Sequence, residues 1–234
     1  MRPVDLQALV MVSERLTPLG VRFAFTGGAV VGFLLDNPHL PFPRQTDDVD
    51  AIVEVVTRIQ YTKLEDKLRT EAGFHHDTSD DAPLCRWIVD GVKVDIMPVR
   101  DPTGNFSDRW FEYALQTAVP RTLHGVTVTT VSATCFVATK LTAFENRGHS
   151  DFAASHDLED LLTIVDGRKT LGVELAAERN DLRQYVAGAI KGLLNTPAFH
   201  DALPGQLPPD GANQARLPLL VQRLEELAAL GAKA

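Results

Sequence analysis

Three aspartates stand where their carboxylates could act together on a cation. Asp48 and Asp50 are separated by one residue, and Asp95 lies in a later apolar stretch, Val94-Asp95-Ile96-Met97. In an extended strand, residues two apart point to the same face, about 7 Å from one another. Such carboxylates repel each other unless a cation lies nearby, and hard divalent cations prefer oxygen ligands. The pattern predicts a Mg²⁺ site, with Mn²⁺ as the alternative cation.

A pair of glycines, Gly27-Gly28, precedes the first two aspartates by some twenty residues. The β-branched and aromatic stretch Val21–Thr26 is typical of a strand, and the apolar stretch Ala29–Leu35 is typical of a helix. The glycines are therefore expected at a strand-to-helix turn. Residues without a Cβ let an anion approach the backbone N–H groups closely. This turn is a candidate phosphate site.

A hairpin is expected to position Asp95. The apolar runs Leu84–Val89 and Val92–Met97 flank Asp90-Gly91, a pair typical of a two-residue type I′ turn. Asp95 then lies inside the second strand of the hairpin. An uncompensated carboxylate is costly to bury, so Asp95 should face a cation, a hydrogen-bond donor or solvent. A third metal ligand meets this requirement.

Helices are predicted before, between and after these strands. Amphipathic spacing indicates a first helix over Leu6–Leu16 and another around Leu64 and Leu68. The proline-rich segment Asn37–Pro43 is a candidate lid. After a hairpin expected over Val119–Thr130, the predicted elements are helices: 136–147 after a cap at Ser132, one capped by Ser155, 173–194 and 214–230.

The order of these motifs resembles the nucleotidyltransferase domain of the DNA polymerase β superfamily. The features that carry the resemblance are Gly27-Gly28, Asp48-x-Asp50 and Asp95. Arg44-x-Thr46-x-Asp48, followed by a block from Lys140 to Arg147 and then His156–Asp160, resembles the minimal bacterial branch that includes AbiEii-type toxins. The similarity covers roughly residues 20–170. It departs at Gly28, where many members carry serine.

The resemblance implies an α/β (α+β) fold: a nucleotidyltransferase-like mixed sheet with flanking helices, followed by a helical C-terminal part. Residues 1–130 would form the catalytic domain, and residues 131–234 would form a helical domain that completes the active-site cleft. The implied reaction moves a nucleoside monophosphate from an NTP to an acceptor hydroxyl and releases pyrophosphate. The protein would thus be a Mg²⁺-dependent enzyme.

The resemblance also implies roles for individual residues. Asp48 and Asp50 would hold the metal ions, while Asp95 would bind the ion beside the incoming hydroxyl and help to deprotonate it. Lys140 would neutralise the triphosphate as a point charge. The other residues assigned to nucleotide binding are Gly27, Gly28, Arg44, Thr46, Arg147, Asp157 and Asp160.

The acceptor stays open at this point. An AbiEii-like toxin implies transfer to a tRNA end and control by a separate antitoxin protein. An antibiotic-type transferase acting on a small molecule is an alternative, as is a nucleotide-binding protein of the same fold without turnover. One fold can combine a shared NTP half-site with different acceptor half-sites.

Composition excludes some classes of protein. The net charge of −8 over 234 residues argues against broad coating of nucleic acid. Local basic residues, Arg86 among them, could contact an RNA end or be ordinary surface charges. No apolar run approaches a membrane span, and the predicted location is the cytoplasm. Cys85 and Cys135 lack CxxC spacing and are expected to be buried thiols, and His75-His76-Asp77 is expected in an ordinary polar loop.

Overall fold

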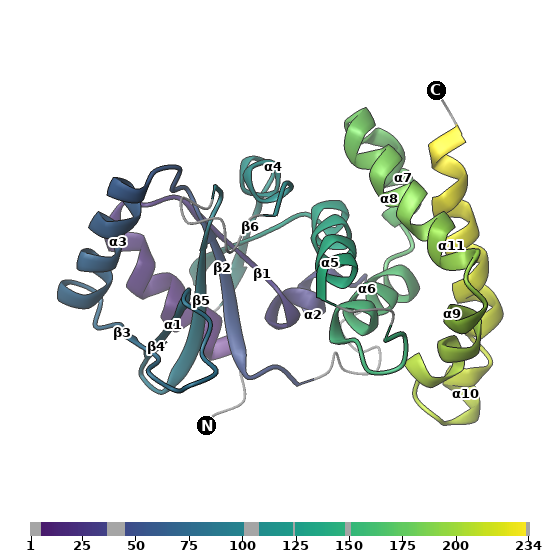
Figure 1. Cartoon of the computed structure of the whole chain (residues 1–234), viewed down its shortest axis with the longest axis horizontal. Coiled ribbons are helices and arrows are strands. Elements are labelled where there is room, and N and C mark those ends of the chain that lie inside the picture. The colour runs from purple at the N-terminus through teal and green to yellow at the C-terminus, as the bar shows by residue number, and fades with distance from the viewer. Residues whose placement is uncertain (1–5, 37–44, 101–107, 124, 148–150, 233–234) are drawn as a thin grey trace. The chain divides into compact units, whose positions relative to one another are not determined.

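The computed structural model describes residues 6–36, 45–100, 108–123, 125–147 and 151–232 (Figure 1). Two compact units form: unit 1 comprises Met1–Val30 and Arg44–Ser132, and unit 2 comprises Val31–Pro43 and Ala133–Ala234. The candidate lid Asn37–Pro43 and the candidate ligand Arg44 lie outside the described residues.

Unit 1 is built on a seven-stranded mixed sheet with the order β3-β4-β5-β2-β1-β7-β6. The pairs β2·β5 and β1·β7 are parallel, and the other neighbouring pairs are antiparallel. A mixed sheet with helices confirms the predicted fold class. The strands are β1 (Phe23–Thr26), β2 (Asp48–Val53), β3 (His75–His76), β4 (Arg86–Val89), β5 (Val92–Pro98), β6 (Val119–Leu123) and β7 (Val126–Thr130).

The strands form where the sequence alternates or is apolar. In β2, the face carrying Val49, Ala51 and Val53 is buried, while Asp48 and Asp50 are only partly covered. The turn between β4 and β5 has positive φ at both central residues, 48° at Asp90 and 79° at Gly91. A type I′ turn requires this conformation, so the predicted hairpin is confirmed.

Helices flank the sheet within unit 1, and they begin and end at recognisable signals. Helix α1 (Leu6–Leu16) buries its apolar face, and the Ser13 hydroxyl donates a hydrogen bond to the Thr127 carbonyl of β7 at 3.1 Å. Helix α3 (Arg58–Thr70) begins with a capping box between Thr57 and Gln60. The remaining helical elements of unit 1 are η1 (Thr17–Leu19), η2 (Gly28–Val30) and α4 (Phe111–Gln116).

The described part of unit 2 is helical, and α8 and α11 lie side by side in it (Figure 1). Large side chains such as Phe136, Leu158 and Phe199 are fully buried in its core. Ser155 caps α6 as predicted, since its hydroxyl accepts a hydrogen bond from the Leu158 N–H. The elements are α2 (Val31–Leu34), α5 (Ala133–Arg147), α6 (His156–Gly167), α7 (Leu171–Ala177), α8 (Asn180–Leu194), α9 (Pro197–Ala202), η3 (Leu203–Gln206), α10 (Gly211–Gln214), α11 (Leu217–Ala229) and η4 (Leu230–Ala232).

Four boundaries differ from the sequence predictions. The helix expected over 173–194 is two helices, because Glu178 and Arg179 have ψ values of 162° and 146° outside the helical region. The last helix, expected over 214–230, is found as α11 and begins three residues later, and Pro218 lies in its first turn, where the missing N–H costs nothing.

The other two differences are short elements. The helix expected over 29–35 is a 3₁₀ turn, η2, followed by the single turn α2. His75 and His76, expected in a loop, form the two-residue strand β3 against β4. No helix within the described ranges is long and apolar enough to cross a membrane.

Candidate functional site

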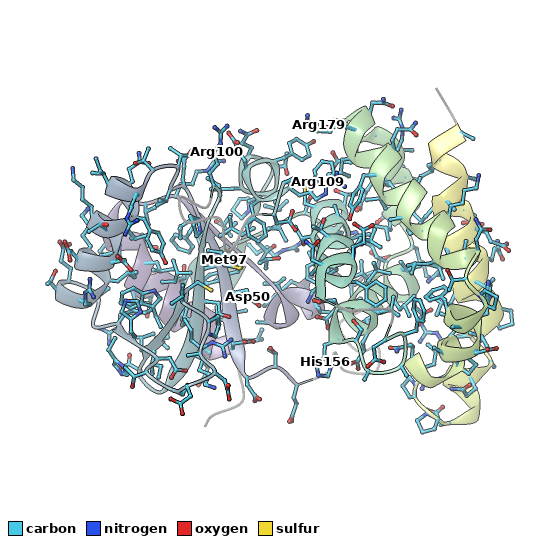
Figure 2. The ribbon with its side chains drawn as sticks, viewed as in Figure 1. Asp50, Met97, Arg100, Arg109, His156 and Arg179 are labelled. Carbon is cyan, nitrogen blue, oxygen red and sulfur yellow. The ribbon has the colours of Figure 1, made fainter. Side chains whose placement is uncertain are left out.

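The predicted acids lie in one row across neighbouring strands of unit 1. Asp50 on β2 is the direct register partner of Asp95 on β5, and Asp95 is in turn the partner of Arg86 on β4. Asp48 lies two residues before Asp50 and therefore shares its face of the sheet. Figure 2 labels Asp50 on β2. We call Asp48, Asp50, Asp95 and Arg86 the acid row.

Arg86 bridges two of these acids. Its Nε donates a hydrogen bond to Asp95 Oδ1 at 2.7 Å. Its Nη2 donates both to Asp95 Oδ2 and to Asp48 Oδ2, each at 2.7 Å. The Arg86 side chain is 17% exposed, against 29% for Asp48 and 11% for Asp95. Short, charge-assisted bonds to a planar fork fix the positions of both carboxylates.

Electrostatics of the acid row follow from these contacts. The hydrogen bonds from Arg86 to Asp95 raise the pKa of the guanidinium further above its ordinary value, so Arg86 is permanently charged. Next to it, burial raises the pKa of the Cys85 thiol to about 12, and the charges of Asp95 and Asp50 act in the same direction. Cys85 and Cys135 are both buried thiols, as predicted.

Gly27 is needed where it stands because the Asp50 carboxylate lies against its Cα. A Cβ built on Gly27 would come within 1.7 Å of Asp50 Oδ2, and its φ of +70° also disfavours any L side chain. Gly27 thus lies between β1 and η2, and Gly28 is the first residue of η2, so the pair stands at a strand-to-helix turn as predicted. Its demonstrable role is to admit the carboxylate of Asp50, while phosphate binding stays a prediction.

Thr46 supports the row from the segment before β2. Its buried hydroxyl donates to Asp48 Oδ1 at 3.0 Å, so both oxygens of Asp48 have a defined donor. Thr46 was predicted to bind nucleotide. The observed contact makes it a residue that orients Asp48, and nucleotide binding by Thr46 remains a prediction.

Three of the residues predicted for the site lie in unit 2 and form a buried cluster within it: Lys140, Asp157 and Asp160. Lys140 on α5 makes ion pairs with Asp157 Oδ1 at 3.0 Å and Asp160 Oδ2 at 2.8 Å, both on α6. Its ammonium also lies 5.6 Å from the centre of the Phe136 ring. These contacts join α5 to α6. These contacts do not test whether Lys140, Asp157 and Asp160 bind nucleotide, which stays a prediction.

The donors for a divalent cation are present in the acid row, but two of them are held by Arg86. Asp48, Asp50 and Asp95 supply carboxylate oxygens on adjacent strands, which suits a hard cation such as Mg²⁺. Across the described residues, no three His, Cys, Asp or Glu side chains are arranged as a metal-binding group. Arg44 is not among the described residues, and the Arg147 side chain is not described.

Sequence reasoning missed the place of Arg86, which it treated as one of several surface charges. A signal for it exists in the hairpin. A two-residue turn at Asp90-Gly91 pairs Val89 with Val92, and counting outward along both strands pairs Arg86 with Asp95. Opposite charges that are direct partners in an antiparallel pair lie within reach of one another.

Searches with the sequence found no matching family model and no matching curated protein. The structure, in contrast, resembles solved nucleotidyltransferase-like proteins. One is an antigenic nucleotidyltransferase-like protein from Paracoccidioides brasiliensis, with a TM-score of 0.53 and 19% identity over 86% of this chain and 94% of that one. Another is the antibiotic-resistance factor ANT(2'')-Ia, with a TM-score of 0.50 and 13% identity over 85% and 99% of the two chains. The chain therefore has a nucleotidyltransferase-like fold.

Proposed function

We propose that this protein is a nucleotidyltransferase that moves a nucleoside monophosphate from an NTP to an acceptor hydroxyl. The observation that carries the proposal is the acid row on this fold: Asp50 and Asp95 are register partners, and Asp48 shares their face. Clustered carboxylates on a rigid sheet meet the need of phosphoryl-type transfer for positioning and charge stabilisation.

The proposed reaction balances without any redox partner. The acceptor oxygen attacks the α-phosphorus of the NTP, and a new P–O bond forms as the bond to the β-phosphate oxygen breaks. Pyrophosphate leaves, and the hydroxyl proton passes to a base. Asp95 is the candidate base. Each of its oxygens accepts one bond from Arg86, and each keeps a second lone pair that could take up the proton.

Mg²⁺, or Mn²⁺ in its place, is the proposed cofactor. Asp48, Asp50 and Asp95 would hold it, and when bound it would stabilise charge on the attacking and leaving oxygens. The chain's own residues set the site: Gly27 admits the Asp50 carboxylate, and Thr46 orients Asp48. A protein with this site that binds nucleotide without turnover is the alternative.

Two acceptor classes follow from different lines of support. The Arg44-x-Thr46-x-Asp48 motif resembles AbiEii-type toxins, which favours a tRNA end as acceptor and an antitoxin as partner. The similarity in fold to the antibiotic-resistance factor ANT(2'')-Ia favours a small-molecule hydroxyl. We place the tRNA end first because motif residues are more specific than a shared fold.

The test is to incubate the purified protein with each α-³²P-labelled NTP, Mg²⁺ or Mn²⁺, and total bacterial RNA. Label in RNA, in protein and in small molecules is resolved separately, with an aminoglycoside mixture in parallel. The proposal expects label in one acceptor class and its loss in Asp48→Ala. Label confined to a tRNA band supports the toxin-like acceptor, and label in the aminoglycoside fraction supports the small-molecule acceptor.

Two results would contradict the proposed function. Full transfer by a folded Asp48→Ala protein would refute the site assignment. Saturable NTP binding without transfer to any tested acceptor would support the binding protein instead. Circular dichroism of the variant separates loss of activity from loss of folding.

A further inference from the structure

The position of Arg86 between carboxylates of different strands bears on how the proposed site binds its cation. Arg86 belongs to β4, Asp95 to β5 and Asp48 to β2, which are three consecutive strands of the sheet. One guanidinium on β4 is therefore shared between a carboxylate on the adjacent strand β5 and a carboxylate on β2, the next strand beyond it. It compensates their repulsion before any metal ion arrives.

The two arms of this contact differ. Asp95 accepts two bonds from the guanidinium and is mostly buried, whereas Asp48 accepts one bond from it and is the more exposed carboxylate. Asp95 is also the register partner of Arg86, so the backbone holds this pair together. The weaker and more accessible contact is the one to Asp48.

We propose that Arg86 is the internal counter-ion of the acid row, and that it gives up Asp48 to an incoming divalent cation while it keeps Asp95. This inference rests on the proposed function, because it concerns how the cation of that reaction reaches Asp48, while Asp95 can still offer the cation a lone pair that Arg86 does not use. Arg86 is a positioning residue in this scheme. It contacts Asp48 and Asp95, and it would act through these two carboxylates.

The competition has a thermodynamic consequence. A cation that binds Asp48 must replace the bond from Arg86, so the two bind the same carboxylate with negative coupling. A bond from a guanidinium to a carboxylate is among the stronger hydrogen bonds, and its loss is enough to change an affinity about tenfold. Arg86 thus stabilises the acid row when no metal ion is bound, and it lowers the affinity of the acid row for a metal ion.

The experiment measures Mn²⁺ binding by calorimetry on the full-length protein without NTP or acceptor. Arg86→Gln should bind Mn²⁺ about tenfold more tightly than wild type, because Asp48 no longer has a competing partner. Its melting temperature should be lower without metal, and Mn²⁺ should raise it more than in wild type. Arg86→Lys keeps the charge without the fork and should fall between the two.

Arg15→Gln is the matched control. Arg15 forms an exposed ion pair with Asp90 in the same unit at 2.8 Å, so its loss removes the same charge away from the acid row. Mn²⁺ affinity should stay at the wild-type value in this variant. Asp48→Asn combined with Arg86→Gln should remove the gain seen in Arg86→Gln.

A folded Arg86→Gln protein with unchanged or weaker Mn²⁺ affinity would overturn the inference. If Arg86→Gln does not fold even with Mn²⁺, Arg86→Lys decides, and wild-type affinity in it would count against the proposal. Failure of the proposed function is distinguishable. A protein that binds Mn²⁺ as expected and transfers nothing refutes the reaction only, whereas active transfer with no effect of Arg86 refutes this inference only.

Discussion

Unit 1 and unit 2 each place one basic side chain between two aspartates, and the two clusters differ in their access to solvent. Arg86 joins Asp48 and Asp95 on strands, and Asp48 keeps 29% of its side chain exposed. Lys140 joins Asp157 and Asp160 between helices, where the lysine is 10% exposed and Asp160 only 2%. The same charges are thus set in different surroundings.

This difference in exposure indicates in which cluster a metal ion can replace the basic side chain beside a carboxylate. A metal ion must reach a carboxylate through water, and Asp48 is accessible while Asp160 is not. A buried ion pair also suffers most when one partner is lost, because the other charge stays buried without compensation. The cation of the proposed function would therefore bind at the acid row of unit 1, while the cluster of unit 2 joins α5 to α6 and its role in nucleotide binding stays a prediction.

The largest expected effect lies in unit 1 and concerns activity. Asp50→Asn removes one carboxylate of the acid row with little change in shape, and transfer should fall about 10³-fold, the equivalent of roughly 4 kcal/mol of charge stabilisation. Initial rates with labelled NTP measure it. Asp90→Asn, in the exposed turn of the same hairpin, is the control and should keep wild-type rates. Equal rates in both variants would remove Asp50 from the site.

The largest effect on stability should lie in unit 2. Lys140→Met leaves Asp157 and Asp160 buried without their shared ammonium, and the free energy of unfolding should fall by about 3–5 kcal/mol. Urea denaturation measures it, and Mn²⁺ should not restore the loss. Lys191→Met, which changes an exposed lysine on α8, should cost far less. A stable Lys140→Met protein with a raised KM for NTP would return Lys140 to the nucleotide site.

A comparison of two glycines of unit 1 distinguishes the cost of backbone strain from the cost of a clash with the acid row. Gly27 and Gly20 have φ values of +70° and +69°, but a Cβ on Gly20 meets no atom within 4 Å. Each change to alanine should cost about 1–2 kcal/mol for the left-handed backbone. Gly27→Ala should lose about 1–3 kcal/mol more from the clash with Asp50, and transfer should fall with it. Equal unfolding midpoints for the two variants would contradict the close approach of Asp50.

Asp108 gives the smallest effect and shows an acid of unit 1 in which burial dominates. Burial raises its pKa from 3.8 to about 6, against the Trp110 N–H and Arg109, which lower it. The stability associated with the protonated form is complete below about pH 4 and is lost as pH rises through 6. Asp108→Asn should therefore melt higher than wild type above pH 6, and the two should converge near pH 4. A constant difference across this range would show that burial does not govern Asp108.

Local patterns in the sequence determined much of the fold. Strand alternation around Asp48 and Asp50, the Asp90-Gly91 turn and the Ser155 cap each predicted an element that the structure contains. These features depend on residues that are neighbours in the chain, which is why the sequence can reveal them. Breaks such as Glu178-Arg179 were missed because helix propensity there is ordinary and no glycine or proline marks the break.

In the candidate site, too, the sequence predicted some features and the tertiary structure decided others. The sequence alone picked out Asp48, Asp50 and Asp95 by residue type and spacing, and it placed Gly27 in the turn beside them. Only the pairing of β2 with β5, a parallel contact between strands far apart in the chain, set Asp50 beside Asp95. The hairpin register pairs Arg86 with Asp95, but only the tertiary structure decided that Arg86 also reaches Asp48 and that Lys140 is buried between two other acids. Charges from distant segments acquire their roles from the partners that folding brings near them, and no local pattern records those partners.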